Sequence, residues 1–277
     1  MSPAPTIALN DGRPMPRLGL GTWPMDDPEA ERAVGSAIEA GYRLIDTAAR
    51  YGNERGVGRA VAAAAVPRGE LFVTTKLRGS QHGRDEALAG FEESRARLGL
   101  DHVDLYLIHW PLPGLDRYVA TWRALIELRD LGVVRSIGVS NFTAAHIERL
   151  ERETGVLPAV NQIELHPDLA QPQMRTWHAA HGIAIQSWSP LGAGSDLLSD
   201  PVIQEIAQAR GRTPAQVVLR WHVQVGAVPI PKSSSQRRMA ENLDVFGFDL
   251  DDAEMATLAA LDRGNRLGGD PDVYVEL

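Results

Sequence analysis

Cysteine is absent from this chain of 277 residues, which excludes disulfides, thiol nucleophiles and cysteine-ligated zinc. No apolar run approaches the ~18 residues that a membrane-spanning helix requires. The first residues, MSPAPTIALNDG, lack the basic and apolar regions of a signal peptide. We therefore expect a cytoplasmic protein that does not bind or cross a membrane.

Positive charge is also scarce, because 28 lysines and arginines stand against 36 aspartates and glutamates. The resulting formal charge of −8 predicts no basic surface for nucleic acid or for an anionic membrane. We expect a small-molecule partner and a monomer.

What the sequence does contain is a regular alternation of short β-rich runs with amphipathic helical stretches. A hairpin with Asp11-Gly12 in its turn comes first, and two helical stretches, around 200–211 and 251–263, exceed the alternation. This pattern predicts an α/β fold: one (β/α)8 TIM barrel domain over 1–277, with an N-terminal β-hairpin and two extra outer helices. The eight predicted strands lie within 18–22, 43–48, 71–77, 103–110, 135–141, 159–165, 183–189 and 227–233.

Two helix starts carry recognisable caps. Asp27 precedes Pro28 and is the predicted N-cap of a helix that ends at Gly41. Thr213 and Pro214 form the same arrangement before a later helix. The final stretch, GNRLGGDPDVYVEL, has no periodicity and predicts either a disordered segment or a loop over the barrel mouth.

Polar side chains stand at the carboxyl ends of the predicted strands, where barrel active sites form. Asp46, Lys76 and His109 end three successive strands, and Tyr51 follows Asp46 in the next loop. Each has an ordinary alternative, such as a helix cap for Asp46 or packing for Tyr51. Together they predict one site that we consider catalytic. Further polar residues at strand ends are Ser140, Asn141, Gln162, Ser189, Lys232 and Ser233.

The four groups suggest proton transfer to a carbonyl oxygen. A buried Lys76 needs a counter-charge, which Asp46 supplies. The ammonium would lower the pKa of Tyr51 from its reference value of ~10, so that Tyr51 acts as a general acid. Hydride must come from a cofactor, yet no dinucleotide fingerprint is present: GLGTWP lacks the third glycine, and GVGRA falls inside a predicted helix.

A candidate phosphate site follows the eighth predicted strand. Within PIPKSSSQRRMAEN, Lys232, Ser233 and Arg238 lie at the start of a helix with a serine N-cap. The alternative is an ordinary solvated basic loop.

Several long motifs give the sequence a family resemblance. GYRLIDTAARYGNE, VDLYLIHWP, SIGVSNF, NQIELHP and IPKSSSQRRMAENLDVF occur in the order found in the aldo-keto reductases. The chain resembles the compact bacterial branch that includes the 2,5-diketogluconate reductases. The resemblance implies reversible, NADPH-dependent reduction of aldehydes, ketones and α-dicarbonyls, with Tyr51 as proton donor, Asp46 and Lys76 tuning it, and His109 orienting the carbonyl.

The resemblance also assigns the cofactor contacts. Ser140, Asn141 and Gln162 would hold the nicotinamide carboxamide, and Trp188 would stack under its ring. Lys232, Ser233 and Arg238 would hold the 2′-phosphate of NADPH. The remaining implied cofactor contacts are Gly21, Thr22, Trp23, Ser189, Leu191, Glu241 and Asn242.

Substrate contacts are implied for Trp23, Trp110 and Arg78. Arg78 departs from the tryptophan of many relatives and could attract an anionic substrate. Short loops predict an open mouth, and we expect small aldehydes and α-dicarbonyls such as methylglyoxal or phenylglyoxal to bind there. His166 is interpreted as structural.

Three alternatives remain at this point. A Schiff-base aldolase would use Lys76 as its nucleophile. A metal hydrolase lacks an early His-x-His pair, and no metal is expected. A regulatory subunit would sense NADPH with little turnover.

Overall fold

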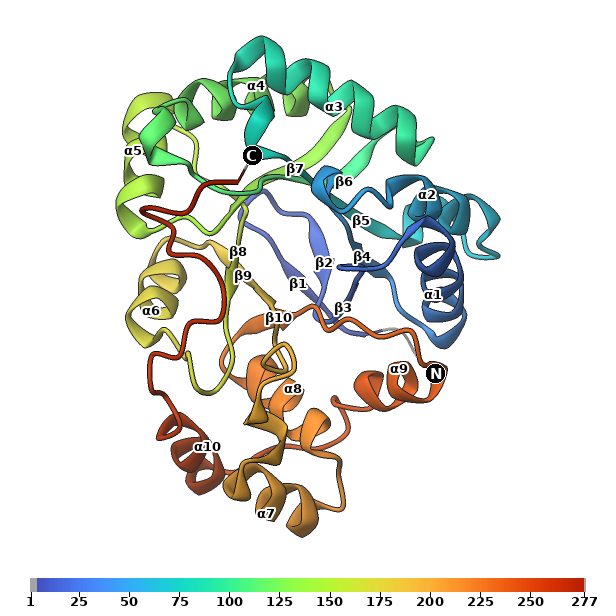
Figure 1. Cartoon of the computed structure of the whole chain (residues 1–277), viewed down its shortest axis with the longest axis vertical. Coiled ribbons are helices and arrows are strands. Elements are labelled where there is room, and N and C mark those ends of the chain that lie inside the picture. The colour runs from blue at the N-terminus through green and yellow to red at the C-terminus, as the bar shows by residue number, and fades with distance from the viewer. Residues whose placement is uncertain (1–3, 277) are drawn as a thin grey trace.

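Eight parallel strands form the centre of the molecule (Figure 1). This computed structural model describes residues 4–276. The strands follow one another around the sheet in chain order, which confirms the predicted barrel. They are β3 (Gly19–Gly21), β4 (Leu44–Asp46), β5 (Phe72–Leu77), β6 (Val103–Ile108), β7 (Val134–Ser140), β8 (Val160–Glu164), β9 (Ala184–Trp188) and β10 (Ala227–Pro229).

Helices surround the strands on the outside of the barrel (Figure 1). Their inner faces pack on strand residues such as Ile45, Val73 and Ile137, forming a continuous apolar layer. The helices are α1 (Asp27–Ala40), α2 (Glu54–Ala63), α3 (Arg84–Leu98), α4 (Tyr118–Asp130), α5 (Ala144–Thr154), α6 (Pro172–Ala180), α7 (Pro201–Arg210), α8 (Pro214–Gln224), α9 (Gln236–Leu243) and α10 (Asp252–Ala259).

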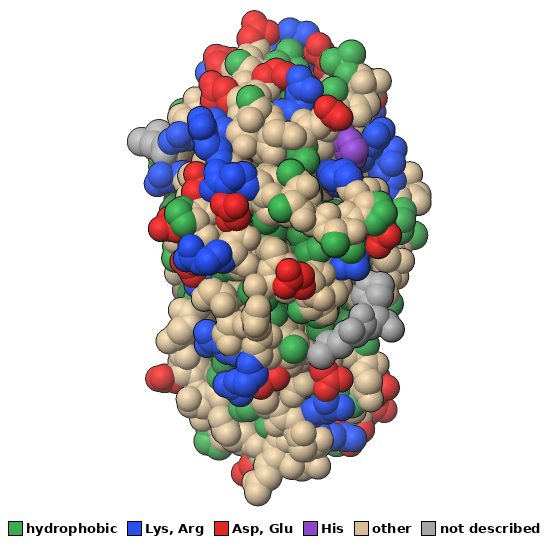
Figure 2. Space-filling model, turned by 90° about the vertical axis from the view of Figure 1, so that its right-hand side faces the viewer, with side chains coloured by type: hydrophobic (Ala, Val, Ile, Leu, Met, Phe, Trp, Pro, Cys, Tyr) green, Lys and Arg blue, Asp and Glu red, His purple; other side chains and the backbone are tan. Residues whose placement is uncertain are grey.

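The two predicted extra helices are α7 and α10. They pack against each other away from the barrel, where Ile203 and Leu258 share one apolar cluster and Arg210 pairs with Glu254 (Figure 1). None of the helices in residues 4–276 has both the length and the apolar character needed to cross a bilayer. On the face drawn in Figure 2, acidic and basic side chains are interspersed.

The barrel is nearly closed between its first and last strands. β3 and β10 approach each other at a single parallel bridge between Gly21 and Lys232. The Gly21 N–H donates to the Pro231 carbonyl at 3.1 Å. A Cβ at Gly21 would lie 3.1 Å from the Ile230 carbonyl oxygen, so the absence of a side chain allows this close approach.

The N-terminal hairpin closes the end of the barrel at which the parallel strands begin. Its strands are β1 (Thr6–Ala8) and β2 (Pro14–Pro16). The predicted Asp11-Gly12 pair lies in the connection between them, with Gly12 in the left-handed region. Leu9 and Met15 pack in one cluster with Leu44 and Phe72, which begin β4 and β5. The carboxyl ends of the strands, with the polar residues predicted there, lie at the other end.

One predicted cap is wrong by a single residue. The N-cap of α1 is Asp26, whose side chain accepts the Glu29 N–H at 2.8 Å. Asp27 accepts the Gly56 N–H at 2.7 Å and so joins α1 to α2. Gly41 ends α1 as predicted, and Thr213 caps α8 in a capping box.

Candidate active site

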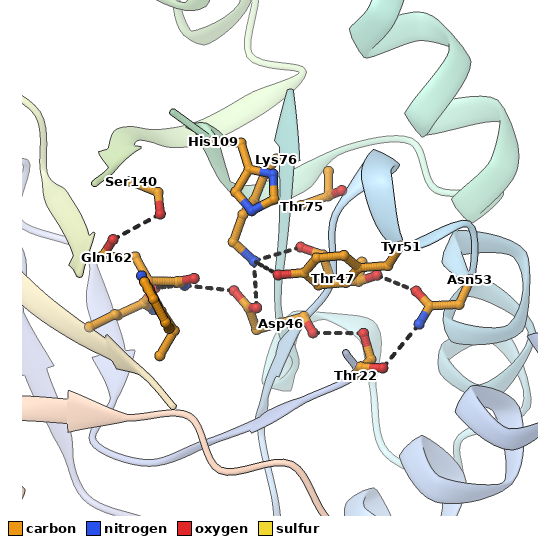
Figure 3. Close-up of polar contacts among 12 residues, drawn as sticks. Thr22, Asp46, Thr47, Tyr51, Asn53, Thr75, Lys76, His109, Ser140 and Gln162 are labelled. Carbon is orange, nitrogen blue, oxygen red and sulfur yellow. Dashed lines mark hydrogen bonds and ion pairs between the residues drawn. The ribbon is translucent and has the colours of Figure 1, made fainter. Parts of the chain in front are cut away.

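Lys76 and Asp46 form a buried ion pair at the carboxyl ends of β4 and β5 (Figure 3). Lys76 Nζ donates to Asp46 Oδ1 at 2.5 Å, to the Thr47 carbonyl at 3.0 Å and to the Tyr51 hydroxyl at 3.3 Å. An ammonium group has three N–H donors, so these contacts use all of them. The lysine is thus fixed in place and charged.

Tyr51 reaches this pair from a short 3-10 turn, Ala49–Tyr51, just after β4. Asn53 holds the turn: it accepts the Thr47 hydroxyl proton at 2.6 Å and donates to the Thr22 carbonyl (Figure 3). It also donates to the Met25 carbonyl. The loop that carries Tyr51 is therefore tied to the loop after β3. This role of Asn53 was not deduced from the sequence.

Lys76 and Tyr51 shift each other's pKa in opposite directions. Burial is the largest single influence and acts to lower the pKa of Lys76, but the charge of Asp46, the Tyr51 hydroxyl and the hydrogen bonds to both together outweigh it, and the net pKa lies above the ordinary value. Burial raises the pKa of Tyr51, with Lys76 opposing the increase and Asp46 adding to it. The expectation of a lowered Tyr51 pKa is therefore wrong, because loss of hydration outweighs the nearby ammonium. The phenol keeps its proton at neutral pH.

Gln162 makes a contact that the resemblance did not suggest. Its Nε2 donates to Asp46 Oδ2 at 2.8 Å and to Gln186 Oε1 at 2.9 Å (Figure 3). Both oxygens of Asp46 are then occupied, one by Lys76 and one by Gln162. The buried carboxylate is thereby compensated by a charge and by hydrogen bonds.

Asn141 connects the ends of β6, β7 and β9. Its Nδ2 donates to the His109 carbonyl at 3.0 Å, and its Oδ1 accepts the Trp188 indole N–H at 2.8 Å. Asn141 and Ser189 both have positive φ, 63° and 48°. Such backbone strain is typical of residues that surround a ligand.

His109 meets a residue that sequence reasoning missed. Its Nδ1 lies 2.7 Å from Glu276 Oε1, and both side chains are largely buried. This close contact engages Nδ1 and leaves Nε2 as the ring nitrogen available to another partner.

A cavity of about 740 Å³ joins these groups into one site. Tyr51, Asp46 and His109 form its floor, while Trp23, 58% exposed, stands at the rim. Trp110 is only 7% exposed, because Tyr274 covers it with ring centroids 4.2 Å apart. The mouth is therefore narrower on this side than the short loops predicted. Other predicted residues that line the cavity are Gly21, Thr22, Asn141, Gln162, Trp188, Ser189, Leu191 and Lys232.

Comparison with known proteins agrees with this geometry. The profile described as "Aldo/keto reductase family" matches residues 17–263. The chain belongs to the aldo/keto reductase family. It is 52% identical to a 2,5-diketo-D-gluconic acid reductase B of a Corynebacterium species and 52% identical to a methylglyoxal reductase DkgA of Yersinia pestis, covering 99% of both chains in each case.

Solved structures of similar proteins show the same fold. A crystal structure of a Gox0644 mutant in complex with NADPH has a TM-score of 0.94 and 47% identity, with 98% of this chain and 99% of that chain covered. The Bombyx mori aldo-keto reductase AKR2E4 in complex with NADP has a TM-score of 0.90 and 38% identity, with 98% and 96% covered. The predicted family is therefore confirmed.

In this aldo-keto reductase the predicted phosphate residues lie at the start of α9. Ser235 is the N-cap of that helix, and the Ser233 hydroxyl accepts the Ser235 N–H at 3.2 Å. Lys232 pairs with Glu29 at 3.2 Å, and Arg238 is exposed, with no carboxylate of residues 4–276 within ion-pair distance. A helix N-terminus with a free arginine suits a phosphate dianion.

Some predicted contacts lie outside the cavity wall. Ser140 donates its hydroxyl proton to the Gln162 carbonyl, and Glu241 pairs with Arg237. Arg78 is partly buried and Asn242 is buried in α9, and neither lines the cavity. Their roles toward cofactor or substrate stay predictions. His166 lies buried between Glu164 and Asp168.

Proposed function

We propose that this aldo-keto reductase reduces small aldehydes and α-dicarbonyls such as methylglyoxal or phenylglyoxal, and oxidises the corresponding alcohols in the reverse direction. As a family member the protein is an NADP-dependent oxidoreductase, and two of the similar solved structures are complexes with NADPH or NADP. When bound, NADPH supplies the hydride. Its expected contacts are the residues that line the long cavity from Trp188 to Lys232, with Arg238 beyond them.

The observation that carries the proposal is the contact between Lys76 and the Tyr51 oxygen. Lys76 only donates, so it occupies a lone pair of that oxygen and leaves the phenol proton directed elsewhere. In our proposal Tyr51 gives this proton to the carbonyl oxygen as negative charge develops there. The fixed charge of Lys76 then stabilises the resulting phenolate.

His109 completes the pair of groups that face the substrate oxygen. Its ring meets the Tyr51 ring edge-on at 5.8 Å between centroids, so both can reach one atom. Donation from Nε2 would orient the carbonyl and polarise it. Trp23, Trp110 and Tyr274 offer flat apolar walls around this point, which favours small planar carbonyl compounds.

The Schiff-base alternative is disfavoured by the state of Lys76. A nucleophilic lysine must be neutral, whereas this ammonium is paired with Asp46 and has all its donors engaged. Borohydride trapping of a carbonyl substrate on Lys76 would nevertheless restore that alternative.

The test is a panel of aldehydes, α-dicarbonyls and keto sugars incubated with the purified protein and NADPH. We expect NADPH absorbance to fall fastest with α-dicarbonyls and with modest selectivity across the panel. Tight NADPH binding without consumption on any member would contradict the proposal and favour an NADPH-sensing subunit.

A further inference from the structure

In residues 273–276 the valine side chains are exposed to solvent and a glutamate side chain is buried. Val273 and Val275 are 74% and 62% exposed, whereas Glu276 is only 4% exposed. The alternating residues, Tyr274 and Glu276, line the cavity instead. Placing valines in water and a carboxylate inside opposes the ordinary solvation preference of each side chain. Such an arrangement needs specific partners for the carboxylate.

Glu276 has those partners on two strands of the barrel. Its Oε1 lies 2.7 Å from His109 Nδ1, just after β6, and its Oε2 accepts the Gly79 N–H at 2.9 Å, just after β5. A Cβ on Gly79 would lie 2.1 Å from the Glu276 carbonyl oxygen. The approach of this segment therefore depends on a glycine at position 79.

The carboxylate is charged in this position. Burial acts to raise the pKa of Glu276, but the His109 contact, the Gly79 N–H and the charge of Arg50 together hold that pKa below the ordinary value. A fixed negative charge thus lies within contact distance of the histidine that faces the reacting carbonyl.

We propose that Glu276 is a specificity-determining residue: its carboxylate fills an anion position beside His109 and thereby disfavours substrates that carry a carboxylate next to the carbonyl. The inference rests on the proposed function. A 2-oxo acid would bring a second negative charge to donors that Glu276 already occupies, and like charges in a desolvated site cost affinity. Neutral aldehydes and dicarbonyls escape this cost.

Matched substrates test the inference. Phenylglyoxal and phenylglyoxylate share a phenyl ring and a ketone but differ in charge. We expect Glu276→Gln and Glu276→Ala to raise the ratio of kcat/KM for phenylglyoxylate to that for phenylglyoxal by about tenfold or more. Asp272→Asn is the control, because it removes one negative charge from the same segment at an exposed side chain that lies outside the cavity. It should leave the ratio unchanged.

Two outcomes would overturn the inference. An equal change for both substrates would mean that the segment has only loosened and that the charge does not discriminate. A change of the kcat/KM ratio in Glu276→Ala but not in Glu276→Gln would assign the effect to side-chain volume, because glutamine retains the size of the side chain and loses its charge.

Binding of benzoate, which has no carbonyl to reduce, separates this inference from the proposed function. Tryptophan fluorescence should show benzoate binding to Glu276→Gln about tenfold more tightly than to the unmodified protein. Tighter binding in a protein that reduces no carbonyl would support the anion position and contradict the proposed function. Equal benzoate affinity, together with active reduction of phenylglyoxal, would overturn the anion position alone.

Discussion

The strand ends that carry Lys76 and the segment 264–276 face the same cavity but are held by different means. Lys76 and Asp46 lie on neighbouring paired strands and are almost fully buried. The segment is held by an acceptor at the carboxyl end of β8: Glu164 accepts the Leu267 and Gly268 N–H groups at 2.7 and 2.9 Å. Figure 1 shows it, coloured red, running from α10 past α6.

This difference separates two tasks. Proton transfer depends on atoms fixed to within fractions of an ångström, and a ladder of backbone hydrogen bonds supplies that rigidity. Choice of substrate depends on the surrounding wall, which a segment outside the sheet can vary without disturbing the barrel. We therefore expect substitutions in the two regions to affect different kinetic parameters.

The largest effect should come from Tyr51→Phe. The ring stays, but the hydroxyl that Lys76 contacts is lost, so kcat should fall by about 10²–10⁴-fold while NADPH still binds. Stopped-flow or steady-state assays with phenylglyoxal measure the loss. Tyr118→Phe, at a tyrosine buried on α4, is the control and should retain activity within about twofold. Retention of most activity in Tyr51→Phe would remove this residue from the mechanism.

A smaller effect is expected at the far end of the cavity. Arg238→Ala removes a charge-assisted hydrogen bond of roughly 1.5–3 kcal/mol, so NADPH affinity should fall by one to two decades while NADH affinity changes little. Fluorescence titration with each cofactor gives the comparison, and Arg152→Ala on exposed α5 surface provides the control. Equal losses for both cofactors would show that Arg238 does not recognise the 2′-phosphate.

The smallest effect should follow from loosening the segment itself. Glu164→Gln retains the volume of the side chain but replaces one of its two accepting oxygens with an NH2 donor, so one of the Leu267 and Gly268 N–H groups loses its acceptor. We expect KM to rise several-fold with kcat little changed, at a stability cost of about 1–3 kcal/mol. Hydrogen exchange across 264–276 should accelerate, whereas the exposed Glu148→Gln should change neither quantity. Unaltered exchange would show that Glu164 does not anchor the segment.

The strands and the polar residues at their ends could be predicted from sequence. In a barrel, a short apolar run that ends in a charged residue fits a buried strand whose carboxyl end opens on the active-site face. Thr213 and Pro214 likewise predicted the start of α8 from local chemistry alone. Asp26 and Asp27 could not be distinguished in this way. Both can cap a helix, and the choice depends on Gly56, which is distant in sequence.

The rest of the site depends on long-range packing that no local pattern encodes. The pKa of Tyr51 depends on burial, which cannot be estimated from the residue's neighbours in the chain. Glu276 was missed because an aperiodic, glycine-rich stretch gives no signal for the face that each residue presents. Gln162 was assigned to the cofactor, and its contact with Asp46 appears only when β4 and β8 are placed around one barrel.

The seam between β3 and β10 has a thermodynamic consequence. These strands are three residues each, and within the described residues a single bridge, Gly21 to Lys232, joins them. The cavity that should hold NADPH lies across this seam, with Gly21 and Lys232 both in its wall. A ligand that binds only the closed barrel stabilises it by linkage, about 2.7 kcal/mol at a concentration of 100 Kd. Bound NADPH would then hold β3 and β10 together. We expect it to raise the melting temperature and to slow hydrogen exchange first at these two strands.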